Sequence, residues 1–223
     1  MHIPDGFLSP EVAAVCAVPA AGAVAYGLRR ASRELDERRV PLLGVTAAFV
    51  FAAQMLNFPV AGGTSGHFLG AALAAILLGP WLAALVLSVV LMVQAFVFAD
   101  GGITALGANV LNMGVVGALV VGGLMVAARR LLGRVGMFSS RGVLLAVAGA
   151  GAWLAVVAGA AVTAVELAIS GTVPLGTVLP GMLGVHVLIG VGEAAITVAA
   201  VSAVLSTRPD VVRAFPVPQG AMA

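Results

Sequence analysis

The sequence contains very little charge and almost no cysteine. Of its 223 residues, 9% are Asp, Glu, Lys or Arg and 61% are hydrophobic, with a mean hydropathy of +1.16. A soluble domain usually carries about a quarter of its residues as charged side chains. The single Cys16 has no second cysteine in the chain to pair with, so a disulfide framework is impossible. These shortages exclude an ordinary water-soluble protein and a small disulfide-stabilised one.

Aromatic residues are scarce as well, at 5%, whereas the chain has 29 glycines. Outer-membrane barrels carry girdles of aromatic residues, whereas closely packed membrane helices are rich in small residues. We therefore predict an all-α fold, a polytopic bundle of membrane helices. We expect one integral membrane domain over residues 1–223, in which 206–223 form a cytoplasmic tail.

Six apolar runs are candidates for membrane spans, which need about 20 residues each. The third run has 32 residues and would form a helix of about 48 Å, well beyond a hydrocarbon core of about 30 Å. Gly79-Pro80 interrupts it, so we expect two helices there, the first of them short and partly buried. The sequence thus predicts seven transmembrane helices. The runs are 11–28, 41–57, 67–98, 103–127, 142–169 and 177–205.

Lysine is absent, and the eleven basic residues are arginines grouped in three clusters. Arginines flanking membrane spans favour the cytoplasmic side, so the clusters indicate topology and not a nucleic-acid partner. The first eleven residues contain no basic residue and so lack the n-region of a secretory signal. We expect an uncleaved first helix with the N-terminus outside. The clusters are Arg29, Arg30, Arg33, Arg38 and Arg39; Arg129, Arg130, Arg134 and Arg141; and Arg208 and Arg213.

This topology places two of the three histidines, His2 and His67, at the outer face. A lone histidine more often caps or packs a helix, but two at one face make a metal site a candidate. The Met1 amine, the backbone nitrogen of His2 and its imidazole can close two fused chelate rings around one ion. The His67 imidazole would supply a fourth nitrogen. A flat four-nitrogen set suits Ni(II) or Cu(II) and can hold Co(II), whereas Zn(II) prefers a tetrahedron and Mg(II) prefers oxygens.

The chain resembles the CbiM/NikM family, the substrate-binding membrane component of energy-coupling factor (ECF) transporters for cobalt and nickel. The resemblance covers essentially the whole chain, and the opening block is its most specific part. It implies that Met1, His2 and His67 hold the metal. The matching blocks are MHIPDGFLSP at the N-terminus, NFPVAGGTSGHFLG at 57–70, VQAFVFADGGITALGANVLNMG at 93–114 and HVLIGVGEAAIT at 186–197.

The same resemblance implies the partners and the location of the chain. It implies a transmembrane coupling subunit, two ABC ATPase subunits and often a small accessory membrane subunit, all in the cytoplasmic membrane of a prokaryote. Some family members begin MHIMEG where this chain begins MHIPDG, a difference outside the ligand positions. The transported substrate is therefore Ni²⁺ or Co²⁺, with the choice between them open.

Other polar residues near the outer face could orient the metal ligands through hydrogen bonds, although helix packing uses the same residue types. His186 and Glu193 lie two turns apart on one face of the last helix, where Glu193 could bond Gln94 or a hydroxyl. We assign a direct metal role to neither of them, nor to Glu166. The candidates for orienting the ligands are Asn57, Ser65, Asp100, Asn109 and Asn112.

Two other functions fit parts of the sequence. Gly63-Thr64-Ser65-Gly66 matches the GxSG pattern of rhomboid intramembrane proteases, in which Ser65 would be activated by His186. That four-residue pattern is weak and leaves MHIPDGF unexplained. A stand-alone metal permease is the second alternative. The chain has no GxxxxGK[ST] motif, so ATP hydrolysis would come from other chains, and we expect a transport component, not an enzyme.

Overall fold

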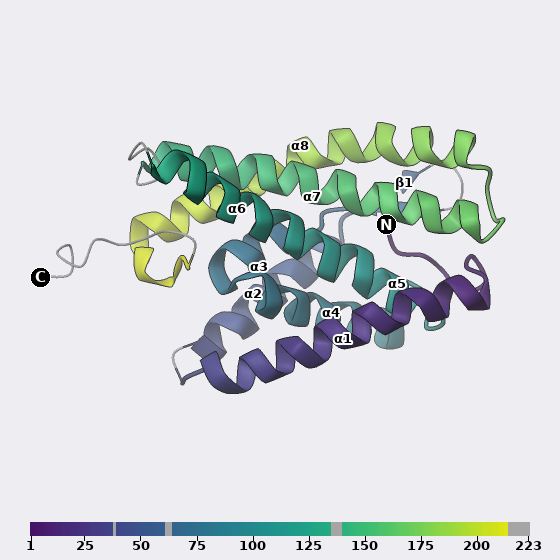
Figure 1. The fold of residues 1–223 in the computed structure, drawn as a ribbon, viewed down its shortest axis with the longest axis horizontal. Helices are drawn as coiled ribbons and strands as arrows, with labels where there is room; N and C mark the ends of the chain where they lie inside the picture. The colour runs from purple at the N-terminus through teal and green to yellow at the C-terminus, as the bar shows by residue number, and fades with distance from the viewer. Residues whose placement is uncertain (38, 61–63, 135–139, 214–223) are drawn as a thin grey trace, which may run out of the picture.

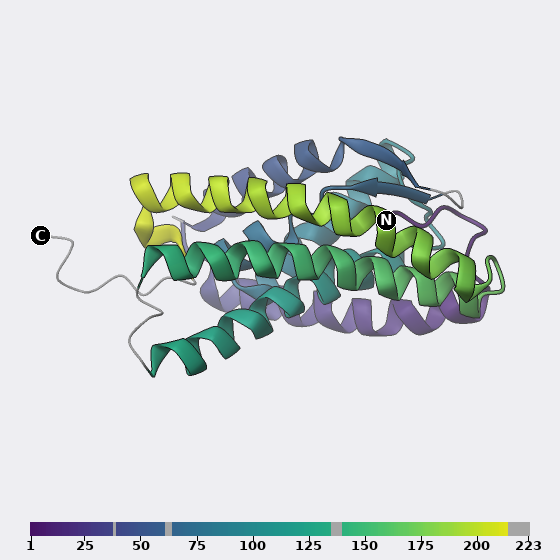
Figure 2. The ribbon, with the colours of Figure 1, turned by 90° about the horizontal axis from the view of Figure 1, so that it is seen from above.

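The structure is a computed structural model that describes residues 1–37, 39–60, 64–134 and 140–213. Its two longest helices, α7 (Arg141–Ile169) and α8 (Leu175–Thr207), run side by side along one face of an elongated bundle (Figures 1 and 2). Helix α1 (Pro10–Glu34) lies on the opposite face. The predicted all-α bundle is confirmed.

Five helical segments of the described chain are long and apolar enough to cross a membrane. They are α1, α4, the continuous segment from 106 to 133, α7 and α8, so the chain is a multi-pass membrane protein. A π-helix inside the 106–133 segment was not expected from the sequence. Helix α4 is Pro80–Val97, and the 106–133 segment consists of α5 (Leu106–Asn109), the π-helix η1 (Val110–Val116) and α6 (Gly117–Gly133). The remaining helices are α2 (Arg39–Gln54), α3 (Ala71–Leu78) and the 3₁₀-helix η3 (Pro209–Val211).

The long third apolar run divides at Gly79, as predicted. Gly79 has a φ of 85°, which favours glycine, and Pro80 directly after it begins α4. Helix α3 has only 8 residues, all of them buried, and at about 1.5 Å per residue it is far shorter than a bilayer core. Its ends are therefore enclosed by protein. The count of seven membrane crossings stays a prediction.

The segment expected as a loop before His67 contains a small antiparallel hairpin. Strand β1 (Asn57–Val60) pairs with β2 (Thr64–His67), so that Asn57 lies opposite His67. The proline and glycines of this segment are typical of loops, which is why the sequence did not indicate the pairing. Gly62 and Gly63 lie outside the described residues. The hairpin ends at His67, and three residues separate His67 from the start of the buried helix α3.

The segments that carry the described arginines, at the C-terminal ends of α1, α6 and α8 and the N-terminal ends of α2 and α7, lie at one end of the bundle, whereas the N-terminus lies among the helices in the other half (Figure 1). The Arg213 guanidinium donates to Glu34 at 2.6 Å, and Arg141 donates to the hydroxyls of Ser202 and Ser206 at 2.8 Å. Arg38 and residues 214–223 of the expected tail lie outside the described part. Which side of the membrane this end faces stays a prediction.

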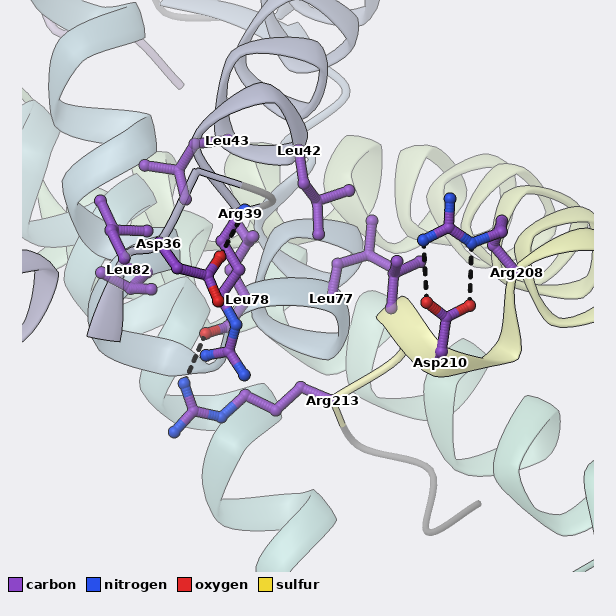
Figure 3. A pocket seen from close by; sticks show the side chains of 12 residues that line it. Asp36, Arg39, Leu42, Leu43, Leu77, Leu78, Leu82, Arg208, Asp210 and Arg213 are labelled. Atoms are coloured by element: carbon purple, nitrogen blue, oxygen red, sulfur yellow. Dashed lines mark hydrogen bonds and ion pairs between the residues drawn. The ribbon is translucent and has the colours of Figure 1, made fainter. Parts of the chain in front are cut away.

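A pocket of about 320 Å³ opens at the arginine end (Figure 3). Leucines and arginines line it, and the Arg208 guanidinium donates two hydrogen bonds to Asp210, at 2.9 and 2.8 Å. None of its lining residues is a histidine. The pocket is therefore separate from the candidate metal site, which lies around the N-terminus.

Candidate metal site

The N-terminal residues are buried inside the bundle. Met1 and His2 are 0% and 3% exposed. Asn109 holds both backbone polar groups of the next residue, Ile3. The Ile3 N–H donates to Asn109 Oδ1 at 2.8 Å, and the Asn109 amide donates back to the Ile3 carbonyl at 3.1 Å. The Gly102 N–H also donates to the Ile3 carbonyl, at 2.8 Å. Asn109 thus acts on the backbone beside His2, which fixes where residues 1 and 2 lie.

Two further anchors hold the rest of the N-terminal segment. Asp5 Oδ1 accepts hydrogen bonds from the Thr104 N–H at 2.7 Å and from its hydroxyl at 2.6 Å. Helix α1 begins after Ser9, whose Oγ accepts from the Val12 N–H at 3.4 Å. The segment before α1 therefore follows a fixed path, along which residues 1–3 are buried in the bundle whereas Asp5 and Gly6 are exposed.

This path brings His2 against His67, which comes from the end of β2. Their imidazole rings are stacked, with centroids 4.3 Å apart and planes inclined by 21°. His67 is completely buried, and Figure 1 shows the N-terminus beside β1. The two histidines that the topology predicted at one face are thus in direct contact.

Hydrogen bonds fix which nitrogen of each ring carries a lone pair. His2 Nε2 lies 3.1 Å from Gln94 Oε1, and His67 Nδ1 lies 2.7 Å from the Phe68 carbonyl oxygen. A carbonyl oxygen only accepts, so each of these nitrogens is protonated. In a neutral ring, the lone pair then lies on Nδ1 of His2 and on Nε2 of His67. In the described part of the chain, neither nitrogen has a hydrogen-bond partner.

The surroundings of His2 Nδ1 suit a cation. This nitrogen lies 3.2 Å from Asp100 Oδ1, although the contact is not a hydrogen bond. A nitrogen lone pair that faces a carboxylate oxygen at this distance is electrostatically unfavourable unless a proton or a metal cation lies beside them. Asp100, expected as a candidate for orienting a ligand, is therefore next to His2.

Burial keeps the Met1 amine and the His67 imidazole uncharged. It lowers the pKa of the Met1 amine from 8.0 to about 5, and the Asp100 carboxylate opposes this shift. Burial also lowers the pKa of His67 well below its usual value of 6.5, and the neighbouring Met1 amine and His2 lower it further, because a charge on either would repel a protonated His67. At neutral pH both groups thus present lone pairs, the form that binds a metal.

Side chains alone do not form a metal site in the described residues, which contain no group of three or more His, Cys, Asp or Glu arranged to hold an ion. An ion bound at the edges of the two stacked rings would therefore also need nitrogens from the main chain. The sequence predicts that the Met1 amine, the His2 backbone nitrogen and the two imidazoles supply such a set. A set made only of nitrogens fits nickel or cobalt and not magnesium.

Of the other residues expected to orient a ligand, Asn112 belongs to a separate hydrogen-bond network. The Asn112 amide donates to Glu166 at 2.6 Å and to Thr163 at 3.2 Å, and the Cys16 thiol donates to the same carboxylate at 3.1 Å. This buried network ties α1, η1 and α7 together. Asn112 therefore has partners other than the histidines. The side chains of Asn57 and Ser65 lie outside the described residues.

Gln94 was missing from the residues expected to orient a ligand, although its side chain bonds His2. A glutamine within the apolar helix α4 was the signal that could have revealed it. Glu193, considered as its partner, instead accepts from the backbone N–H groups of Leu69 at 2.8 Å and Gly70 at 2.7 Å. His186 bonds the carbonyl one turn before it, at Met182, with 2.7 Å between Nδ1 and oxygen.

Known proteins are similar to this chain in both sequence and fold. A family model described as CbiM, cobalt uptake substrate-specific transmembrane region, matches residues 2–211. The chain is 42% identical to the putative metal transport protein of Haloquadratum walsbyi, over 95% of this chain and 93% of that protein. It is 38% identical to the fused nickel transport protein NikMN of Rhodobacter capsulatus, over 94% of this chain and 63% of that protein. The crystal structure of a truncated transition metal transporter superposes with a TM-score of 0.82 at 32% identity, covering 92% of this chain and 99% of that one.

Proposed function

We propose that this chain, which belongs to the CbiM family of cobalt uptake substrate-specific transmembrane regions, captures Ni²⁺ or Co²⁺ through Met1, His2 and His67. As a component of nickel or cobalt transport with a metal-transporter fold, it is not an enzyme. In the proposal, the ion enters from the outer face of a prokaryotic cytoplasmic membrane and is the transported substrate. The choice between nickel and cobalt stays open.

One observation carries the proposal, namely the stacking of two buried imidazoles beside a buried amine. His2 Nδ1 and His67 Nε2 are without hydrogen-bond partners in the described structure, and the Met1 amine has its pKa lowered to about 5. Leaving two buried imidazole nitrogens without a hydrogen bond is costly unless they gain a partner when the protein binds its ligand. A metal ion would satisfy both imidazole nitrogens and use the uncharged amine at the same time.

The energy source in the proposal lies in other chains. The sequence has no ATP-binding GxxxxGK[ST] motif. Its relative NikMN is a fused protein, of which this chain spans 63%, which supports a component that works with further polypeptides. We propose that these are an ECF transmembrane coupling subunit, two ABC ATPase subunits and a small accessory membrane subunit.

The two alternative functions are not favoured. Family membership indicates metal transport and gives no support to peptide hydrolysis. In addition, His186 Nδ1 donates to the Met182 carbonyl in its own helix, as a packing histidine does, whereas His186 Nε2 has no hydrogen-bond partner among the described residues. The stand-alone permease would need polar groups along several helices, whereas the apolar helices have mean hydropathies of up to 2.2.

Calorimetric titration of the purified chain with Ni²⁺ or Co²⁺ tests the proposal, and we expect saturation at about one ion per chain. Binding that displaces the His2 amide proton should release about one proton per ion near pH 7. Because the pKa of the Met1 amine is about 5, a second proton should compete only below that pH, where the affinity should fall more steeply. Binding whose affinity falls by about 100-fold per pH unit between about pH 8 and 6, the slope for two protons, would show an amine titrating as in water.

The control for this titration is Mg²⁺, which prefers oxygen ligands and should give no heat of binding. The proposed function is wrong if the purified chain binds neither nickel nor cobalt at any pH. It is also wrong if Mg²⁺ binds as tightly as either of them.

A further inference from the structure

The segment after His67 connects the candidate metal site to the buried helix α3. His67 Nδ1 bonds the carbonyl oxygen of the neighbouring Phe68 at 2.7 Å. The direction of the ring, and hence of the lone pair on Nε2, therefore depends on the backbone at Phe68. Whatever fixes that backbone also aims the His67 nitrogen.

A buried carboxylate from the far end of the sequence holds the backbone immediately after Phe68. Glu193 of α8 is 3% exposed, and its two oxygens accept from the Leu69 N–H at 2.8 Å and the Gly70 N–H at 2.7 Å. Charge-assisted bonds to two consecutive N–H groups are stronger than neutral ones and define one geometry. The carboxylate also lies at the N-terminal end of α3, where negative charge is favoured.

Helix α2 holds the carbonyl side of the peptide group between Leu69 and Gly70. Gln54 is completely buried, and its amide donates to the Leu69 carbonyl at 2.7 Å. Gly70 has a φ of 73°, and a Cβ there would come within 2.7 Å of a methyl group of Val50. Only glycine fits this position, so the backbone between His67 and α3 is confined by α2 and by α8.

We propose that Glu193 and Gln54 are positioning residues, which clamp the backbone at Leu69 and Gly70 and thereby aim the His67 imidazole at the metal. This inference rests on the proposed function, because it assumes that His67 binds the ion. It gives the buried carboxylate of α8 a role in the site without direct contact with the metal. Groups that orient a metal ligand typically change affinity by about 10- to 100-fold when they are removed.

The test compares Glu193→Gln and Gln54→Leu with the unmodified chain. The glutamine keeps the shape of Glu193 but its nitrogen cannot accept, so one of the two N–H groups loses its partner. We expect each variant to bind Ni²⁺ about 10-fold more weakly or worse, with a shifted visible absorption spectrum of the bound nickel. Thr197→Val is the matched control, since Thr197 is also buried on α8 one turn further on and should leave both readouts unchanged.

A second readout needs no metal. In the metal-free protein, the amides of residues 67–70 should exchange hydrogen faster in Glu193→Gln and in Gln54→Leu than in the unmodified chain. Gln54→Leu gives the answer if Glu193→Gln does not fold. Unchanged exchange together with unchanged affinity and spectrum in the folded variants would overturn the inference. An unmodified chain that binds no nickel would instead contradict the proposed function, and the exchange rates would still decide whether the clamp exists.

Discussion

A chain extended by one residue before Met1 should lose detectable nickel and cobalt binding. The extension converts the Met1 amine into an amide nitrogen and moves the new amine beyond the chelate that it forms with His2. Losing one metal-binding nitrogen should weaken binding by more than the roughly 100-fold upper range seen when only an orienting group is lost. Calorimetric titration with Ni²⁺ measures the effect.

The control for this experiment is a one-residue extension after Ala223, which should bind as the unmodified chain does. Because Met1 is fully buried, the melting temperature of each variant should be measured without metal. Acetylation of the Met1 amine adds fewer atoms and removes the same lone pair, so it should have the same effect. Undiminished binding by the extended or the acetylated chain would exclude the N-terminal chelate.

Replacement of His67 by alanine should weaken metal binding by at least about 10- to 100-fold, because it removes a nitrogen that contacts the ion. The His67 ring also stacks on His2 at 4.3 Å, so the substitution takes away the group that packs against the second imidazole. Titration of folded His67→Ala protein with Ni²⁺ measures the loss.

His186→Ala is the matched control, since His186 is an equally buried histidine whose Nδ1 is bonded within α8. We expect it to reduce affinity less than His67→Ala does. If His67→Ala kept the affinity of the unmodified chain while His186→Ala lost it, the site would have to be placed in α8.

Residue chemistry and topology predicted the contact between His2 and His67. Apolar run lengths and arginine clusters placed these two residues at one face, and the structure stacks their rings. The break at Gly79-Pro80 was equally predictable, because 32 apolar residues exceed a bilayer. Both results depend on properties that can be read locally, namely hydrophobic length, charge and helix breakers.

The hydrogen-bond partners of the site were not predictable in the same way. Glu193 lies 124 residues from Leu69, and Gln94 lies 92 residues from His2. Such pairings follow from how α4 and α8 pack against the N-terminus and β2, which no local pattern encodes. Asn112 shows the reverse case, because its polarity and position suggested the metal site whereas its amide bonds Glu166.

The coordination of nickel by the purified chain tests the central claim most directly. X-ray absorption spectroscopy of the nickel-loaded protein should show an ion surrounded by four nitrogens in a plane, two of them from imidazoles. Those nitrogens would be the Met1 amine, the His2 backbone nitrogen, His2 Nδ1 and His67 Nε2. A tetrahedral site, a shell made mostly of oxygens, or a spectrum with no imidazole contribution would contradict the account.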